Sequence, residues 1–398
     1  MPAFDDSFEE LNTSQQKAVR HREGHLLIVA GPGTGKTHTL VYRIASLLKE
    51  LKKGEKILAI TFTQKAARQM RDRLVPFLKD DNPPLFVGTF HQFCLNLLKE
   101  HSPQACSPII DPAGSEAVAK ELWPELSLRE RRLLLEKISQ WKVGSFDEEA
   151  LPEAEILSQR YKEKSFMDFD DILLQALRLL RKRKDVLKDV QAAYSHVCVD
   201  EYQDINQLQH EILKVLVGEG GALTAIGDPH QAIYGFRGSD VRFFGSFEKD
   251  FPGARVLLLS ENYRSAQHLL KASGQVAQSI AGRFVPDLTA KIYLEGKLTV
   301  HEAPTDKAEA EYIVHQVEKL VGGTSLFSQI RGAWTAMRRP REVLGTSRSS
   351  IGSIASAVFS RRPLRAAAFL FRRPDTGPPG KERTLSTTFI SHRTRSLM

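Results

Sequence analysis

Residues 26–37 read LLIVAGPGTGKT, a short apolar run that leads directly into a glycine-rich loop. The run LLIVA predicts a buried β-strand, and the glycines allow a tight turn whose backbone N–H groups wrap a phosphate chain. A helix pattern follows, and the positive end of that helix would point at the same anion. The order of strand, loop and helix therefore predicts a P-loop, the binding site of a nucleoside triphosphate.

The loop supplies the groups that ATP and Mg²⁺ require. Lys36 is expected to reach the β- and γ-phosphates, and Thr37 is expected to bind Mg²⁺. The loop departs from the usual pattern at Ala30, where a glycine is more common. The predicted nucleotide-binding residues of this loop are Gly31, Gly33, Thr34, Gly35, Lys36 and Thr37.

Further apolar runs rich in β-branched residues alternate with amphipathic helix patterns. Such alternation predicts an α/β fold in which helices cover both faces of a parallel sheet. Between about Phe93 and Val190 the pattern is helical, which predicts a helical domain inserted between two strands of one sheet. The other predicted strands are ILAIT (57–61), LFVG (85–88), VCV (197–199), LTAIG (223–227) and VLLL (256–259).

The run VCV leads into DEYQD, which places Asp200 and Glu201 at the end of a predicted strand. A P-loop site needs a metal-binding acid on a neighbouring strand, so Asp200 is expected to hold Mg²⁺. Glu201 is expected to accept a proton from the attacking water as general base. This adjacent glutamate favours hydrolysis, with ADP and phosphate as products.

The net charge of the chain, +8 over 398 residues, comes from its C-terminal part. Residues 329–398 carry 13 Arg and 1 Lys against 3 acidic residues, a net +11, whereas the remainder has 42 basic and 45 acidic residues, a net −3. The overall charge therefore gives no argument that the folded body binds DNA. The tail is either a disordered basic extension or the gene read in a wrong frame, and we favour the second explanation.

Composition also bears on the cellular compartment. The cysteines Cys94, Cys106 and Cys198 are widely spaced, which predicts buried thiols in a reducing environment rather than disulfides or a zinc site. The N-terminus is acidic, and no apolar run approaches the roughly 18 residues that a membrane span needs. We expect a cytoplasmic protein with no membrane partner.

The chain contains six ordered motifs that resemble the ATP-binding half of the UvrD/Rep/PcrA group of superfamily 1 DNA helicases. These motifs are AGPGTGKT, AITFTQKAARQM, VGTFHQFC, VDEYQD, GDPHQAIYGFRGSD and LSENYRS. In addition, LNTSQQKAV resembles the adenine-reading motif of that group, and SFMDFDDIL resembles its usual approach to the acidic strand. The resemblance covers about residues 11–328 and implies two RecA-like domains, with ATP in the cleft between them and DNA across both.

The resemblance also implies a domain organisation. Beyond LSENYRS the group requires most of a second RecA-like domain, and residues from Gln329 onward do not resemble it. We therefore expect an incomplete copy that binds ATP weakly, shows negligible DNA-stimulated hydrolysis and does not unwind duplex DNA. The predicted regions are 1–92 with 191–257 as RecA-like ATP-binding domain 1A, 93–190 as inserted helical subdomain 1B, 258–328 as the beginning of RecA-like domain 2A, and 329–398 as a divergent, disordered basic tail.

Further site residues follow from motif position alone. By resemblance, Gln15 would read the adenine edge, and Tyr263 would stack on the base. Gln231 and Arg264 would contact the γ-phosphate and act in catalysis with Lys36 and Glu201. By resemblance, six further residues lie at positions that contact single-stranded DNA: Phe62, Thr89, His91, Tyr234, Phe236 and Arg237. Core packing stays an alternative role for Phe62 and His91.

The segment GDPHQAIYGFRGSD, residues 227–240, would join the two predicted sites, because a phosphate sensor and base-stacking rings lie a few residues apart. We predict an ATP-dependent DNA helicase or translocase that moves 3′ to 5′ and couples ATP hydrolysis to strand separation in repair or replication. Its partners would be single-stranded DNA and junctions of single- and double-stranded DNA.

Two other functions stay open. The first is a nucleotide-gated DNA-binding module without motor activity. The second is the helicase subunit of a recombination nuclease, which would need a C-terminal nuclease domain with clustered acids. The acidic residues of the tail are Glu342, Asp375 and Glu382.

Overall fold

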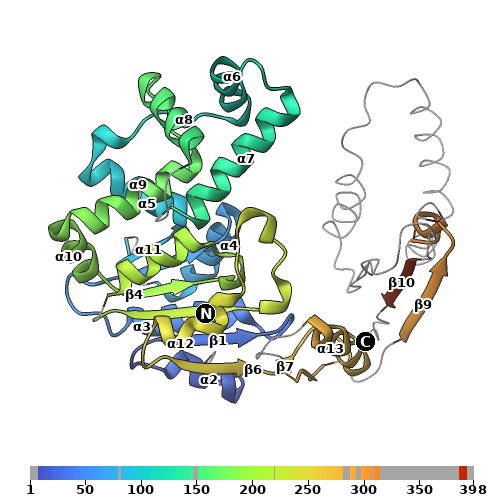
Figure 1. The fold of residues 1–398 in the computed structure, drawn as a ribbon. Helices are drawn as coiled ribbons and strands as arrows, with labels where there is room; N and C mark the ends of the chain where they lie inside the picture. The colour runs from blue at the N-terminus through green and yellow to red at the C-terminus, as the bar shows by residue number, and fades with distance from the viewer. Residues whose placement is uncertain are drawn as a thin grey trace. The chain divides into compact units, whose positions relative to one another are not determined.

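The computed structural model describes residues 8–78, 82–146, 151–218, 220–280, 287–292, 297–305, 308–313 and 385–391. The chain divides into two compact units (Figure 1). The first unit comprises Met1–Ser265 with Ser273–Ile292, and the second comprises Ala266–Ala272 with Tyr293–Met398.

A six-stranded sheet forms the centre of the first unit. Its strand order is β3-β2-β4-β5-β1-β6, and every neighbouring pair is parallel. This arrangement confirms the predicted α/β fold, and it brings the carboxyl ends of all six strands to one edge, where ligands of such sheets bind. The strands are β1 Leu26–Ala30, β2 Lys56–Thr61, β3 Leu85–Thr89, β4 Tyr194–Val199, β5 Ala222–Gly227 and β6 Arg255–Leu259.

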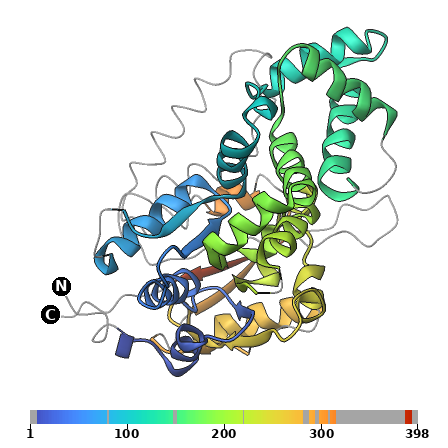
Figure 2. The same cartoon turned by 90° about the vertical axis from the view of Figure 1, so that its left-hand side faces the viewer.

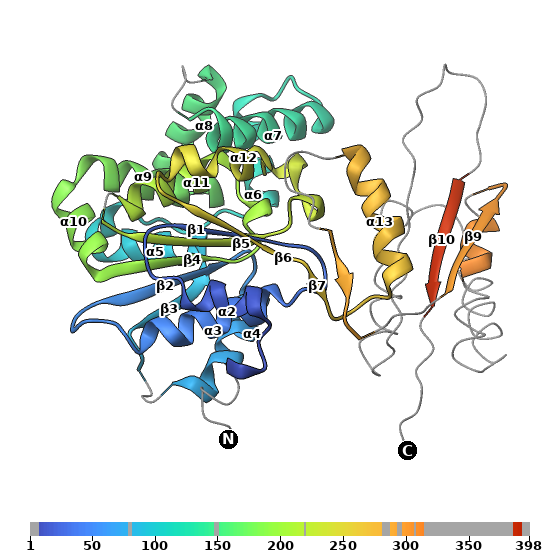
Figure 3. The same cartoon turned by 90° about the horizontal axis from the view of Figure 1, so that it is seen from below.

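Helices cover both faces of this sheet, because its central strands are apolar on both sides. In β1, Leu27 and Val29 belong to one buried cluster, whereas Leu26 and Ile28 belong to another on the opposite face. Figure 3 shows the two helix layers on either side of the strands. One layer contains α2 Thr13–Arg20, α3 Lys36–Leu48 and α4 Gln64–Leu74, and the other contains α5 Phe90–His101, α9 Phe169–Lys182, α10 Lys184–Ala193, α11 Gln207–Val217 and α12 Arg242–Asp250.

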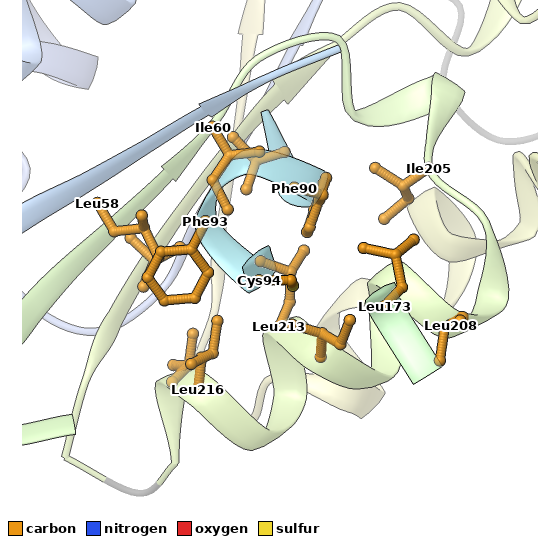
Figure 4. Close-up of a cluster of buried hydrophobic side chains, with 14 of the residues drawn as sticks. Leu58, Ile60, Phe90, Phe93, Cys94, Leu173, Ile205, Leu208, Leu213 and Leu216 are labelled. Atoms are coloured by element: carbon orange, nitrogen blue, oxygen red, sulfur yellow. The ribbon is translucent and has the colours of Figure 1, made fainter. Parts of the chain in front are cut away.

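The larger cluster lies between β2, α5, α9 and α11 (Figure 4). Each large apolar side chain fully buried in such a core contributes about 1.5–3 kcal/mol. The cluster fixes the ends of β2 and β3 against α5 and α9. Its labelled members in Figure 4 are Leu58, Ile60, Phe90, Phe93, Cys94, Leu173, Ile205, Leu208, Leu213 and Leu216.

The helical segment between β3 and β4 contains helices of two kinds. Helices α5, α9 and α10 pack on the sheet, whereas the helices between them share a separate core that includes Ile110, Val118, Ile138 and Leu157. Figure 2 shows this second group standing away from the sheet. The separate helices are α6 Pro112–Leu122, α7 Leu128–Gly144 and α8 Pro152–Glu163. The boundaries 93 and 190 of the inserted subdomain stay a prediction.

A buried arginine fixes α2 against the sheet. Arg43 on α3 is only 1% exposed, and its Nη1 donates to the carbonyls of Ala18 and His21 at 2.7 Å each. Its Nε donates to the hydroxyl of Thr224 on β5 at 2.7 Å. The two carbonyls lie at the end of α2, where the helix cannot satisfy them itself. Burial lowers the pKa of Arg43 to about 10, so the guanidinium stays charged at neutral pH.

The chain after β6 contains further short elements. Strand β7, Glu261–Asn262, pairs in parallel with β8, Thr289–Ala290, and α13, Gln267–Ile280, lies between them in the sequence. Of the region expected to begin a second RecA-like domain, residues 281–286, 293–296, 306–307 and 314–328 lie outside the described residues.

The second unit contains an antiparallel strand pair, β9 Lys297–Ala303 and β10 Leu385–Ser391. Strand β10 lies within the basic tail, whose disorder stays a prediction. Its sequence, LSTTFIS, is rich in β-branched and aromatic residues, which favour strands, and the net charge of the tail hides this local pattern. Residues 329–384 and 392–398 of the tail lie outside the described residues.

Two compositional expectations can be compared with this fold. Cys94 and Cys198 are buried, as expected, whereas Cys106 is only partly buried, and all three are free thiols. Within the described ranges, none of the helices combines the length and the apolar character that crossing a membrane requires.

Candidate functional site

The P-loop connects the end of β1 to the start of α3. Gly33 and Gly35 adopt φ values of +75° and +85°, the left-handed region that favours glycine. Gly35 also caps α3 and makes no side-chain cap bond to the first N–H groups of that helix. A Cβ atom at Gly33 would lie 2.6 Å from the Cβ of Arg264, so only glycine fits there. The loop therefore presents open N–H groups to an anion.

Hydrogen bonds hold this loop in shape. The hydroxyl of Thr34 donates to the carbonyl of Gly31 at 2.7 Å, and Nζ of Lys36 lies 3.3 Å from the carbonyl of Ala30. Gln15, which is 4% exposed, donates its Nε2 to the carbonyl of Thr34 at 3.0 Å. The predicted adenine reader thus contacts the P-loop directly. Its side-chain oxygen accepts a bond from the backbone of Asn12 in the cap of α2.

A hydroxyl oxygen after the P-loop and a carboxylate oxygen after β4 lie close together, as a metal site requires. Asp200 follows β4, is 5% exposed, and forms a hydrogen bond with the hydroxyl of Thr37. Burial, and next the charge of Glu201, raise the pKa of the Asp200 carboxyl to about 7. Hydroxyl and carboxylate oxygens are ligands that Mg²⁺ prefers. Thr37 and Asp200 therefore fit a bound Mg²⁺.

A third acidic residue, Asp204, lies near Asp200 and Glu201. Asp204 is 9% exposed, and in the described part of the chain its Oδ1 has no hydrogen-bond partner. Burial, and next the charge of Glu201, raise the pKa of Asp204 to about 6. Buried carboxylates without partners are costly unless positive charge compensates them. The charge of Lys36 acts on both Asp200 and Asp204, and a bound cation would compensate these carboxyls further.

Glu201 stands in a rare backbone conformation. Its φ is +53° and its ψ is +48°, a left-handed geometry that costs a non-glycine residue about 1–3 kcal/mol and concentrates at functional sites. Its Oε2 accepts a hydrogen bond from Nε2 of Gln203 at 2.8 Å. The predicted general base is therefore held by both its backbone and its carboxylate.

The residues after β6 cover the P-loop. The side chain of Asn262 donates to the carbonyl of Pro32, and the backbone N–H of Tyr263 donates to the carbonyl of Gly33 at 2.9 Å. The hydroxyl of Tyr263 accepts from Nδ2 of Asn12 at 2.9 Å. The structure thus brings Tyr263 beside the cap of α2, which contains Gln15. Arg264 follows and its side chain is exposed.

The segment after β5 reaches from this region to an aromatic surface. Gln231 donates its Nε2 to Oδ2 of Asp228 at 2.7 Å. A few residues later, Tyr234 packs against Phe62, which follows β2, with ring centroids 4.7 Å apart. Phe236 is 66% exposed, and the guanidinium of Arg237 lies 5.6 Å from its ring centroid. The surface therefore presents open ring faces beside a cation.

A second pair of rings lies after β3. His91 is edge-on to Phe169 with centroids 5.8 Å apart, and burial lowers the pKa of His91, which keeps its ring neutral. Phe169 is 56% exposed at the start of α9, whose cap residue Asp168 is bound by the buried Lys142 at 2.7 Å. Thr89 is buried, and its hydroxyl caps α5, while its contact with DNA stays a prediction.

Sequence reasoning missed several residues that hold the predicted ones in place. All of them lie within motifs already quoted, and that position is the only signal that could have found them. Because they contact other side chains rather than a predicted ligand, motif matching gave them no role. They are Asn12, Phe169, Gln203, Asp228 and Asn262.

These features define a class: an α/β nucleotide-binding protein with a P-loop after β1, acids after the neighbouring strand β4, and exposed aromatic rings at the same sheet edge. The chain belongs to the UvrD/REP helicase family, because the UvrD/REP helicase N-terminal domain matches residues 11–252. This membership confirms the resemblance predicted from the six motifs.

Curated relatives agree with this membership. The chain is 33% identical over 331 residues to the ATP-dependent DNA helicase PcrA of Staphylococcus aureus, a match that covers 78% of this chain and 45% of that protein. It is 33% identical over 333 residues to PcrA of Staphylococcus epidermidis, with 78% and 46% covered. The chain thus spans less than half the length of these relatives.

Proposed function

We propose that this protein is an ATP-dependent DNA helicase or translocase that moves 3′ to 5′ on single-stranded DNA and acts in DNA repair or replication. One observation carries the proposal. The segment 227–240 begins at the predicted nucleotide site, where Asp228 binds Gln231, and continues to the rings of the partly buried Tyr234 and the exposed Phe236. Family membership and the similarity to PcrA support the same function.

In the proposed reaction, the P-loop N–H groups and Lys36 hold the phosphates of ATP. Thr37 and Asp200 would hold Mg²⁺, which neutralises charge on the phosphate oxygens when bound. The oxygen of water bonds to the γ-phosphorus, and the bond from that phosphorus to the bridging oxygen of ADP breaks. Glu201 accepts the proton that the water loses. Gln231 and Arg264 would contact the γ-phosphate from two sides.

DNA would lie along the aromatic surface made by Phe62, His91, Tyr234, Phe236 and Arg237, extended by the neighbouring ring of Phe169. Stacking of a base on an aromatic ring contributes about 1–3 kcal/mol and accepts any base. Such contacts suit a motor that must grip every sequence alike. The phosphate backbone adds attraction that weakens with salt.

The decisive experiment measures ATP hydrolysis by the 398-residue chain with and without single-stranded oligo(dT), beside Glu201→Gln. A motor's turnover rises with DNA, and Glu201→Gln should keep ATP binding while it loses about 10²–10⁴-fold in turnover. Binding of both ligands without DNA-stimulated turnover would favour the nucleotide-gated DNA-binding module. The assay also tests the expectation of negligible stimulation that follows from the missing resemblance after residue 328, which DNA-stimulated turnover by this chain would contradict. Unwinding of duplexes with a 3′ or a 5′ tail would contradict that expectation too, and would give the direction of movement.

A further inference from the structure

A continuous chain of hydrogen bonds joins the predicted general base to the segment that carries the aromatic surface. Glu201 Oε2 accepts from Nε2 of Gln203 at 2.8 Å, and Oε1 of Gln203 accepts the backbone N–H of Asp228 at 2.9 Å. The carboxylate of Asp228 then accepts the N–H of His230 at 3.0 Å and Nε2 of Gln231 at 2.7 Å. Both ends of one planar amide are therefore used.

The middle of this chain is shielded from water. Gln203 is 2% exposed and Asp228 is 1% exposed. Hydrogen bonds in such surroundings are stronger than in water, and a buried amide that loses a partner has no solvent to replace it. Displacement of Asp228 therefore has to move Gln203 and the carboxylate of Glu201 together, or leave buried polar atoms unsatisfied.

Gly227 shows independently that this contact shapes the local sequence. A Cβ atom at Gly227 would lie 2.4 Å from Oε1 of Gln203. The φ of Gly227 is not in the left-handed region, so backbone conformation does not require a glycine there. The close approach of Gln203, together with Phe244 Cζ at 2.9 Å and the backbone N of Tyr202 at 3.0 Å, leaves little room for a side chain. Gly227 and Gln203 thus form a matched pair at the junction of β5 and the acidic strand end.

We propose that Gln203 is a positioning residue that links the nucleotide and DNA sites by joining Glu201 to the segment 228–237. This inference rests on the proposed function and adds the physical connection between its two sites. Nucleotide that engages Glu201 or Gln231 shifts Asp228, and the shift passes along the short segment to Tyr234 and Phe236. DNA bound to those rings acts back on Glu201 by the same route, because coupling between two sites is reciprocal.

The test measures the affinity of the full chain for fluorescent oligo(dT) with and without Mg²⁺ and a non-hydrolysable ATP analogue. In the parent, nucleotide should change the oligo(dT) affinity by about 5-fold or more. In Gln203→Met both ligands should still bind, but the change should fall below about 2-fold. Glu201→Gln should keep the parental coupling, because its amide oxygen still accepts from Gln203, although turnover is lost.

Two controls separate this linkage from general damage. Gln191→Met removes another side-chain bond in the same domain, the one from Nε2 to the carbonyl of Val215 at 2.8 Å, and should leave coupling unchanged. Thermal unfolding shows whether each variant is folded. If Gln203→Met does not fold, Gln203→Glu replaces it. That variant keeps the size and the acceptor for Asp228, but its carboxyl cannot donate to Glu201 once it is ionised, so coupling measured at alkaline pH should also be lost.

The outcomes separate the inference from the proposed function. A parent chain that binds both ligands without mutual effect overturns the linkage and leaves both sites standing. If a folded Gln203→Met variant keeps the parental coupling, the linkage through Gln203 is likewise overturned, and both sites still stand. A parent that binds neither nucleotide nor oligo(dT) contradicts the proposed function itself.

Discussion

The nucleotide end and the aromatic end of the candidate site are built in opposite ways. At the nucleotide end, Gln15, Thr34 and Asp200 are buried, and hydrogen bonds fix each of them. At the aromatic end, Phe236 is 66% exposed and contacts its neighbours only through ring faces and edges. Phosphates need donors fixed in direction before they bind, whereas bases of any sequence need open, adaptable ring faces.

The largest effect at the nucleotide end is expected for Lys36→Ala. We expect hydrolysis of ATP to fall by at least about 10²-fold, because a fixed positive charge on the phosphates is lost. The ammonium of Lys36 lies 3.3 Å from a loop carbonyl, and its charge also acts on the buried carboxyls of Asp200 and Asp204. We expect the variant to fold, which thermal unfolding checks. Radiolabelled ATP measures the turnover. Unchanged hydrolysis with normal ATP binding would contradict the P-loop assignment.

Two phenylalanines eight residues apart test the difference between buried and exposed rings. Phe244 is 2% exposed and packs against Tyr202, so Phe244→Ala should lower the free energy of unfolding by about 3–5 kcal/mol. Phe236→Ala should change it by less than about 0.5 kcal/mol. Urea denaturation measures both. A large loss for Phe236→Ala would assign that ring to the core.

Arg43→Met probes the support of the nucleotide end. The variant leaves the carbonyls of Ala18 and His21 without their buried donor, so we expect the free energy of unfolding to fall by about 2–4 kcal/mol. ATP affinity should fall as well, because α2 carries Gln15. Arg183→Met is the control, since Arg183 is an exposed arginine paired with Asp185 at the surface. Equal loss in both variants would argue against a special role for the buried guanidinium.

The smallest expected effect is a loss of DNA affinity at the aromatic end. Phe236→Ala should weaken binding of single-stranded DNA by about 1–3 kcal/mol, equally for oligo(dT) and oligo(dA), because stacking accepts any base. Fluorescence anisotropy at several salt concentrations gives the affinities, and added salt should weaken parent and variant alike. A loss confined to one base would show sequence readout instead of a general grip.

The sheet was predictable because each of its strands contains an apolar run bounded by turn residues. The run VCV marks only the buried end of β4, since Tyr194–His196 are partly exposed and polar enough to hide the strand's start. The helical insertion was predictable as a whole. Which of its helices pack on the sheet was not, because an amphipathic pattern shows that a helix buries one face but not against what.

The candidate site also has a part that was predictable from the sequence and a part that was not. Motif positions indicated Lys36, Asp200 and Glu201, and the structure brings them together at one sheet edge. The contact between Gln203 and Asp228 could not be read from the sequence, because a side-chain oxygen and a backbone N–H 25 residues apart leave no periodic signal. Strand β10 was missed because the composition of the whole tail outweighed a seven-residue pattern within it.

The strand order also dictates how the protein must be made. Strand β1, which leads into the P-loop, pairs only with β5 and β6 within the described sheet, and β5 begins at Ala222. A ribosome adding about 5–20 residues per second needs roughly 10–40 s to synthesise the chain between these strands. During that interval the apolar run LLIVA has no sheet neighbour. The nascent chain therefore depends on chaperones or on early packing of α3 to keep its nucleotide-binding strand from aggregating.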